Sequence, residues 1–191
     1  MEKKKEIEPK DYALCFIPAP VYLISTVDEH NVYNIAPYGM VMPVSYYPLV
    51  ISIGSSKNRD TYRNIKASNE FVLNIPNINL LRKVNRTADP IPSDMDEFIH
   101  ADLTPINSKT VRPPSIMECC AHMECKTIWI KDISEEAENR VIITANVVAL
   151  FINENLFLKN LCKQKGLMNP LYYEKLSYFT LGGYVGNRKM R

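Results

Sequence analysis

The chain has 191 residues, 46% hydrophobic and 23% charged, which is typical of a globular protein with one sizeable core. Lys and Arg number 23 and Asp and Glu 21, so the net charge of +2 gives no reason to expect nucleic-acid binding or a polybasic membrane anchor. Residues 1–12 form a charged extension without the apolar run of a signal peptide, and no segment approaches the ~20 apolar residues of a membrane-spanning helix. We therefore expect a single cytoplasmic domain over residues 1–191.

The first half of the chain consists of short apolar runs separated by turn residues, which is the pattern of a mainly β fold. Pro20–Val27 and Val32–Ala36 predict a hairpin across the polar turn Asp28–Asn31. A further run covers Tyr38–Val44. Leu49–Ile53 is short, apolar and β-branched, which predicts a strand buried on both faces.

Helical segments are short. Asp60–Ile65 and Leu80–Asn85 predict two of them, the first with Asp60 or a neighbour as its cap, and Leu156–Lys165 predicts a third in the tail. The Pro- and Ser-rich excursion from Ala88 to Pro114 predicts a surface loop with a helical turn near Met95–His100. The remaining strands are expected at Glu70–Pro76, Glu124–Ile130 and Val141–Ile152. Many short strands with few helices favour a closed or nearly closed barrel.

Three cysteines and a histidine gather in one window: Cys119, Cys120, His122 and Cys125. Zinc ligands must converge, whereas adjacent residues on a strand point to opposite faces, so Cys119 and Cys120 are poorly placed to share an ion. We interpret the cysteines as structural, with a metal site as the alternative. None of the three histidines forms a recognisable catalytic pattern, and no catalytic side chain is predicted.

The segment Ile51–Ile65 concentrates groups that bind a phosphate. It supplies Ser55, Ser56, Lys57 and Arg59 directly before the predicted helix start at Asp60. Hydroxyls, one or two cations and a helix N-terminus are what a phosphate requires. A solvated strand–helix loop is the alternative. The spacing is that of neither a Walker loop nor a Rossmann fingerprint.

The segment Asn34–Pro48 carries Pro37, Gly39 and Pro43 within a strand-like run. Proline and glycine in such a run indicate an edge, a bulge or a close approach of the backbone to a ligand. The alternative is a kinked barrel strand in which methionine fills the core.

These two segments, followed by Glu70–Pro76 and then Met123–Cys125, resemble the flavin reductase-like and flavoredoxin family, whose members are FMN-binding split β-barrels. The resemblance covers about Pro18 to Phe151 and rests on the order and spacing of four weak motifs. It implies FMN as the cofactor, NAD(P)H as a candidate co-substrate, and a homodimer. Gly39 departs from the Ser or Thr of many members, which removes a hydroxyl donor.

The resemblance also implies which residues bind the cofactor. Those expected beside the flavin ring are Tyr38, Gly39, Met40, Val41 and Met42, and those expected around the phosphate are Ser55, Ser56, Lys57, Arg59, Asp60 and Thr61. Lys83 and Arg86 are interpreted as a solvated helix face, and Tyr184 receives no role.

Three functions remain open at this point. The chain is an FMN-dependent oxidoreductase that takes electrons from NAD(P)H or a protein donor, or an FMN electron carrier like flavoredoxin, or a non-redox barrel that binds another phosphorylated ligand. The family resemblance favours the first.

Overall fold

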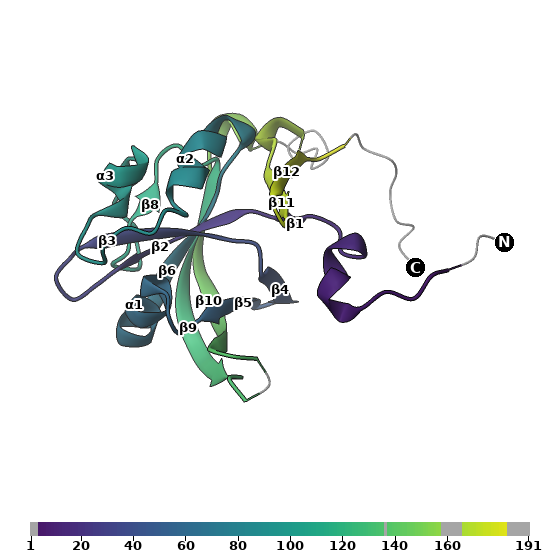
Figure 1. Ribbon diagram of the computed structural model, residues 1–191. Coiled ribbons are helices and arrows are strands. Elements are labelled where there is room, and N and C mark those ends of the chain that lie inside the picture. Colours follow the sequence, from purple (N-terminus) through teal and green to yellow (C-terminus); the bar gives the residue numbers. More distant parts are fainter. Residues whose placement is uncertain (1–3, 136, 158–165, 183–191) are drawn as a thin grey trace.

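The computed structural model describes residues 4–135, 137–157 and 166–182. Its centre is a seven-stranded antiparallel sheet with the strand order β3-β2-β6-β9-β10-β5-β4 (Figure 1). The strands of this sheet are β2 (Tyr22–Val27), β3 (Tyr33–Tyr38), β4 (Val41–Tyr46), β5 (Leu49–Ser56), β6 (Glu70–Ile75), β9 (Ala121–Asp132) and β10 (Arg140–Ile152). The predicted hairpin is confirmed as β2–β3, in which Tyr22 pairs with Tyr38.

The sheet curls into a barrel that is split between β3 and β4. These strands lie at opposite ends of the strand order, yet only Gly39 and Met40 connect them. Two residues span at most about 10 Å of extended chain, so the two edges of the sheet must approach each other. The predicted strand Tyr38–Val44 is therefore wrong in one respect, because it is two edge strands with a crossing between them.

The barrel interior and one outer face each hold a hydrophobic core. The interior core is formed by Ile24, Ile51, Ile53, Ile65, Phe71, Leu73, Cys125, Val141, Ile143 and Ala145. The second core lies outside β2 and β3 and is formed by Val21, Leu23, Ile35, Leu80, Val84, Phe98, Ala101, Leu103, Ile116, Cys119 and Leu171. β2 supplies both cores and is buried on both faces, whereas β5 alternates between buried and partly exposed residues. The expectation that β5 is buried on both faces was wrong.

The helices close the open ends of these cores. α1 (Asp60–Ser68) contributes Ile65 to the barrel interior, and α2 (Leu81–Arg86) and α3 (Glu97–Ala101) cover the second core (Figure 1). The expected helices at 60–65 and 80–85 are confirmed. The N-cap of α1, expected at Asp60 or a neighbour, is the neighbour Arg59, and its side chain makes no capping hydrogen bond.

Short elements complete the chain. The 3₁₀ helices are η1 (Pro9–Leu14), η2 (Ile78–Leu80) and η3 (Glu154–Leu156), and the remaining strands are β1 (Ala19–Pro20), β7 (Pro105–Ile106), β8 (Ser115–Ile116), β11 (Leu171–Glu174) and β12 (Ser177–Thr180). β11 and β12 form a hairpin that pairs with β1. The predicted helix 156–165 lies almost entirely outside the described residues, as does Tyr184. Within the described ranges, no helix is long and apolar enough to span a membrane.

Candidate functional site

A cleft runs along the split of the barrel and consists of three adjoining pockets that share Arg59 and Ala88. The serine pocket, of about 180 Å³, is lined by Ala36, Pro37, Tyr38, Gly39, Met40, Gly54, Ser55, Ser56, Arg59, Ala88 and Arg140. The helix pocket, of about 180 Å³, is lined by Asn34, Ala36, Asn58, Arg59, Asp60, Thr61, Thr87, Ala88, Asp89, Pro90, Ile91 and Glu97. The tyrosine pocket, of about 450 Å³, is lined by Val21, Pro37, Tyr38, Gly39, Arg59, Asn85, Ala88, Tyr173, Leu176 and Tyr178.

The serine pocket lies where the two edges of the barrel meet. The Tyr38 hydroxyl on β3 and the Ser55 hydroxyl on β5 are 2.8 Å apart, which is a hydrogen bond across the split. The Gly54 N–H donates to the Met40 carbonyl at 2.8 Å. A Cβ at Gly54 would lie 3.2 Å from the Cβ of Met40, so a side chain there would press on the crossing between β3 and β4. Burial raises the pKa of Tyr38, which keeps its hydroxyl neutral.

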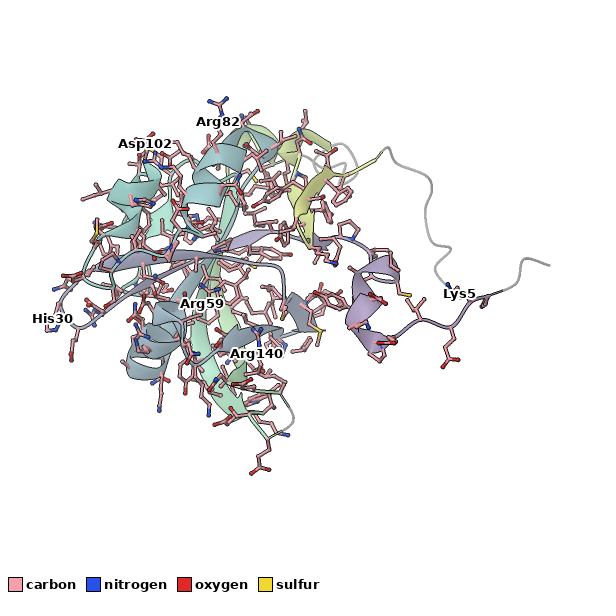
Figure 2. The ribbon with its side chains drawn as sticks, viewed as in Figure 1. Lys5, His30, Arg59, Arg82, Asp102 and Arg140 are labelled. Carbon is pink, nitrogen blue, oxygen red and sulfur yellow. The ribbon has the colours of Figure 1, made fainter. Side chains whose placement is uncertain are left out.

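Two cations give this end of the cleft a positive charge. Arg59 precedes α1, and Arg140 begins β10, where it pairs in register with Ser56 (Figure 2). Both lower the pKa of Tyr38 electrostatically, against the larger effect of burial. Among the described residues, no carboxylate lines the serine pocket or the tyrosine pocket.

A buried hydrogen-bond network fixes the helix pocket. The Asn34 side-chain carbonyl on β3 accepts from the hydroxyl of Thr61 at 3.0 Å and from that of Thr26 at 3.1 Å. This ties the first turn of α1 to the barrel. Glu97 accepts from the Ile35 N–H, and burial raises the pKa of its carboxyl to about 7.

The first turn of α1 leaves donors available. The Arg63 N–H donates to the carbonyl of the N-cap residue Arg59, which is the first i to i−4 hydrogen bond of the helix. The N–H groups of residues 60–62 precede the first intrahelical bond, and no side chain of the N-cap satisfies them. An anion in front of this turn would interact favourably with these groups and with Arg59.

Comparison with known proteins identifies the family. The flavin reductase like domain matches residues 14–182, which is most of the chain. The chain belongs to the flavin reductase-like family. Its strand order and short helices confirm the expected mainly β, split-barrel fold.

Two relatives of this flavin reductase-like chain are named only as uncharacterised proteins. An uncharacterised protein of Methanothermobacter thermautotrophicus is 42% identical over 141 residues, which is 74% of this chain and 66% of that protein. One from Aquifex aeolicus is 33% identical over 58% of this chain and 59% of its own length. The chain therefore spans somewhat less than two thirds of the length of these two relatives.

Solved structures share the fold over nearly the whole chain. Nitrilotriacetate monooxygenase component B from Bacillus cereus has a TM-score of 0.89 and 26% identity, covering 98% of this chain and 100% of its own. Flavoredoxin of Desulfovibrio vulgaris has a TM-score of 0.82 at 18% identity, covering 98% of this chain and 97% of its own. Flavoredoxin from Methanosarcina acetivorans has a TM-score of 0.83 at 21% identity, covering 97% and 95%.

Eight of the eleven residues predicted for the flavin reductase-like site line the cleft. Tyr38, Gly39, Met40, Ser55, Ser56 and Arg59 line the serine pocket, and Asp60 and Thr61 line the helix pocket. The other three line none of the three pockets. Val41 packs against the interior core, Met42 is 59% exposed, and the Lys57 ammonium pairs with Asp132. Ligand contact by these eleven residues stays a prediction.

The sequence interpretation missed Arg140, Asn34 and the wall of the tyrosine pocket. Arg140 ends a charged turn, so it resembled a solvated residue until the β5–β10 register placed it opposite Ser56. Tyr173 and Tyr178 reach the cleft only because their hairpin pairs with β1. Lys83, by contrast, is engaged by Asp102 at 3.0 Å, while its helix neighbour Asn85 lines the cleft.

The cysteine window does not converge. Cys119, Cys120 and Cys125 pack into three different hydrophobic clusters. Burial raises the pKa of the Cys119 and Cys125 thiols, so they behave as small apolar side chains. In the ranges that the structure covers, no three His, Cys, Asp or Glu side chains are grouped as a metal site requires.

Proposed function

We propose that this chain binds FMN in the cleft at the barrel split and uses it to transfer electrons. The observation that carries the proposal is the polarity of the cleft. One end presents Arg59, Arg140 and the open first turn of α1, and the other end, beyond Arg59, is lined mainly by apolar and tyrosine side chains. A flavin mononucleotide has the same polarity, with a phosphate at one end and a planar ring system at the other.

The residues present fit an FMN phosphate in the serine pocket next to Arg59, because that pocket has no carboxylate in its described lining, whereas Asp60, Asp89 and Glu97 line the helix pocket. Arg59 lines both pockets, the Ser56 hydroxyl lies beside it, and residues 60–62 offer backbone N–H groups. A cation at an N-cap opposes the helix dipole, so a bound dianion would offset the repulsion between Arg59 and the helix N-terminus. Arg140 supplies a second charge from β10, the strand that pairs with β5.

The ring system would lie along Pro37–Met40, as the family resemblance implies. Pro37 has no N–H, and Gly39 has no side chain, so the backbone there can approach a flat ligand closely. The pockets have volumes of about 180 and 450 Å³ on the two sides of this segment, which suits a ligand of this size. The neutral Tyr38 hydroxyl, held by Ser55, orients this segment without adding charge.

When bound, FMN supplies the redox chemistry, and the protein supplies position and access. Family membership and the flavoredoxin-like fold support an oxidoreductase fed by NAD(P)H or by a protein donor. Stopped-flow absorbance of the FMN-loaded protein mixed with NADH and NADPH tests the donor. Bleaching of the flavin by either nucleotide supports a nicotinamide-dependent enzyme. If neither nucleotide bleaches the flavin, the electron-carrier function is favoured.

We further propose that the protein is a homodimer formed through the outer face of the barrel. Met42 and Trp129 stand in one row across β4, β5, β10 and β9, because Ser52 pairs with Met42 and with Thr144, and Thr144 pairs with Trp129. Met42 is 59% and Trp129 47% exposed. Met42 and Trp129 are exposed apolar side chains at the two ends of this row, with Ser52 and the buried Thr144 between them, and exposed apolar side chains that gather on one face mark interfaces.

Sedimentation at micromolar concentration tests the dimer. We expect a dimer mass for the wild type and a monomer mass for Trp129→Glu with unchanged circular dichroism. A monomer mass for the wild type would contradict the proposal.

A further inference from the structure

The carboxyl of Glu97 is a titratable group of the cleft that the proposed function does not use. Glu97 begins α3 and lines the helix pocket, which shares Arg59 with the serine pocket. Its carboxylate accepts from the Ile35 N–H on β3 and forms a second hydrogen bond with the side chain of Asn34. Glu97 and the expected phosphate therefore have Arg59 as a common neighbour.

Asn34 connects Glu97 to α1. The Asn34 side-chain oxygen accepts from Thr61 at 3.0 Å and from Thr26 at 3.1 Å, so the amide N–H groups of Asn34 are the end that faces Glu97. The Thr26 hydroxyl in turn accepts from the side chain of Asn64 on α1 at 3.0 Å. Hydrogen bonds thus run without a break from Glu97 to the helix turn whose N–H groups are offered to the phosphate.

The other acidic groups around Glu97 have partners of their own. The charged residues that line the helix pocket and a neighbouring pocket of about 120 Å³, or that act on Glu97 electrostatically, are Asp28, Arg59, Asp60, Arg63, Asp89 and His100. Asp60 pairs with Arg63, Asp89 pairs with His100 at 2.8 Å, and Asp28 accepts from two N–H groups of its own turn. Among the described residues, no opposite charge lies within ion-pair distance of Glu97 or of Arg59. These two are the charges on which a bound phosphate would act most.

The charge state of Glu97 depends on Arg59. Burial raises the pKa of Glu97 to about 7, and the hydrogen bonds to its carboxylate and the charges of His100 and Arg59 oppose this to a smaller extent. A phosphate of about −2 bound to Arg59 would change the net charge there from about +1 to about −1. The carboxylate of Glu97 would then lose a favourable interaction and gain a repulsive one. Binding of a dianion beside Arg59 should therefore be accompanied by uptake of a proton.

We infer that Glu97 is a positioning residue for the cofactor phosphate, and that FMN binding is coupled to protonation of its carboxyl. The neutral acid still accepts from the Ile35 N–H and holds Asn34, so the first turn of α1 stays in place, and it no longer repels the phosphate. The proton comes from the solvent and remains on the carboxyl while FMN is bound. The inference rests on the proposed function, because it takes the phosphate to lie at Arg59.

The test compares FMN binding by the wild type and by Glu97→Gln at pH 6 and pH 8, measured by quenching of flavin fluorescence. Gln has the shape of the neutral acid and carries no charge, so it represents the protonated form of Glu97. If FMN raises the pKa of Glu97 from 7 by about one unit, both proteins bind FMN within about twofold at pH 6, and Glu97→Gln binds about fivefold more tightly at pH 8. The phosphate of FMN titrates near pH 6, but it does so equally for both proteins and cancels in the ratio of their affinities.

Two controls separate the charge of Glu97 from its structural role. Riboflavin has no phosphate, so the ratio of its affinities for the two proteins should stay within about twofold between pH 6 and pH 8. Glu124→Gln is the matched control variant, because the Glu124 carboxylate also accepts backbone N–H groups, lines none of the three pockets and has a lowered pKa. The FMN affinity of Glu124→Gln should follow that of the wild type at both pH values.

Calorimetry gives a readout that does not depend on the affinity. When FMN binding is measured at pH 7.5 in two buffers of different ionisation enthalpy, the wild type should take up about half a proton more than Glu97→Gln, because half of the carboxyls change state there. Equal proton uptake by both proteins would overturn the inference.

Three results of the affinity measurements would also overturn it. One is a ratio of FMN affinities that does not change with pH, and another is weaker FMN binding by Glu97→Gln at both pH values, which is the result of a purely structural role. The third is the same pH dependence with riboflavin, since the phosphate would then not be the coupled group. Failure of the proposed function is distinguishable, because the wild type would then take up no FMN at either pH, and the inference would fall with it.

Discussion

Arg59 and Lys57 are two cations of the same loop that lie in different surroundings. We therefore expect their removal to have unequal effects on FMN binding. Arg59 lines all three pockets, whereas the Lys57 ammonium pairs with Asp132 near the far end of β9 and lines none of them. Sequence reasoning gave both the same role. The geometry assigns phosphate binding to Arg59 and leaves Lys57 as its control.

The expected loss for Arg59→Ala follows from one charge-assisted hydrogen bond. Such bonds contribute about 1.5–3 kcal/mol. Arg59 is exposed, so the lower end applies, and ~1.5 kcal/mol corresponds to a roughly tenfold weaker FMN affinity. Lys57→Ala removes a surface ion pair with Asp132, and it should weaken the free energy of FMN binding by less than about 1 kcal/mol.

Riboflavin separates a phosphate contact from a general loss of the site. The dissociation constants of FMN and riboflavin are measured for the wild type and both variants by quenching of flavin fluorescence at constant ionic strength. Arg59→Ala should weaken FMN tenfold and leave riboflavin within twofold. Equal losses for both ligands, or an FMN loss in Lys57→Ala as large as that in Arg59→Ala, would refute the assignment.

Three further predictions concern buried polar groups. The Asn74 side chain is fully buried, donates to the Leu23 carbonyl and the Ser25 hydroxyl, and accepts from the Ile116 N–H. Asn74→Leu should therefore lower the free energy of unfolding by about 2–4 kcal/mol in urea titrations, and a loss below about 1 kcal/mol would contradict this. Glu97 has a folded-state pKa of about 7, above its unfolded value, so its contribution to stability is complete at acidic pH and is lost as the pH rises through 7. Glu97→Gln should therefore flatten the stability profile between pH 5 and 8 by up to ~3 kcal/mol, and an unchanged slope would argue against it. For Glu124, burial raises the pKa of the carboxyl, but hydrogen bonds from Thr110 and Lys109 outweigh burial and lower the pKa. Its contribution to stability is therefore lost as the pH falls, and Glu124→Gln should make acid unfolding less steep. An acid-unfolding profile as steep as that of the wild type would contradict this.

The local pattern of residues predicted most of the strands, the helices α1 and α2, and a helical turn near Met95–His100, where α3 lies. The β2–β3 hairpin follows from two β-branched runs around a polar turn, and α1 follows from the change of pattern after Gly54. These features depend on neighbours in sequence, which is why they were accessible.

The break at Gly39 and Met40 was not accessible in the same way. The run Tyr38–Val44 is continuously strand-like, and only closure of the barrel makes its two halves opposite edges of one sheet. The burial of β5 on one face is likewise a consequence of its place beside the edge strand β4.

Some parts of the site could likewise be predicted from the local sequence, and others could not. The serine and helix pockets come largely from two contiguous segments, 34–40 and 54–61, so motif order identified them. Arg140 and Tyr173 are brought in by strand pairing over more than 80 residues of sequence, and no local signal marks them. Lys57 is the opposite case. Its residue type and its motif suit a phosphate site, but its ammonium pairs with Asp132 instead of lining the cleft.

Whether the cleft at the barrel split holds FMN is decided by a visible absorption spectrum of the purified protein, followed by heat release and mass identification of the chromophore. We expect a yellow protein that releases FMN, or a colourless one that takes up added FMN in equimolar amount. A colourless protein that fails to take up FMN would contradict it.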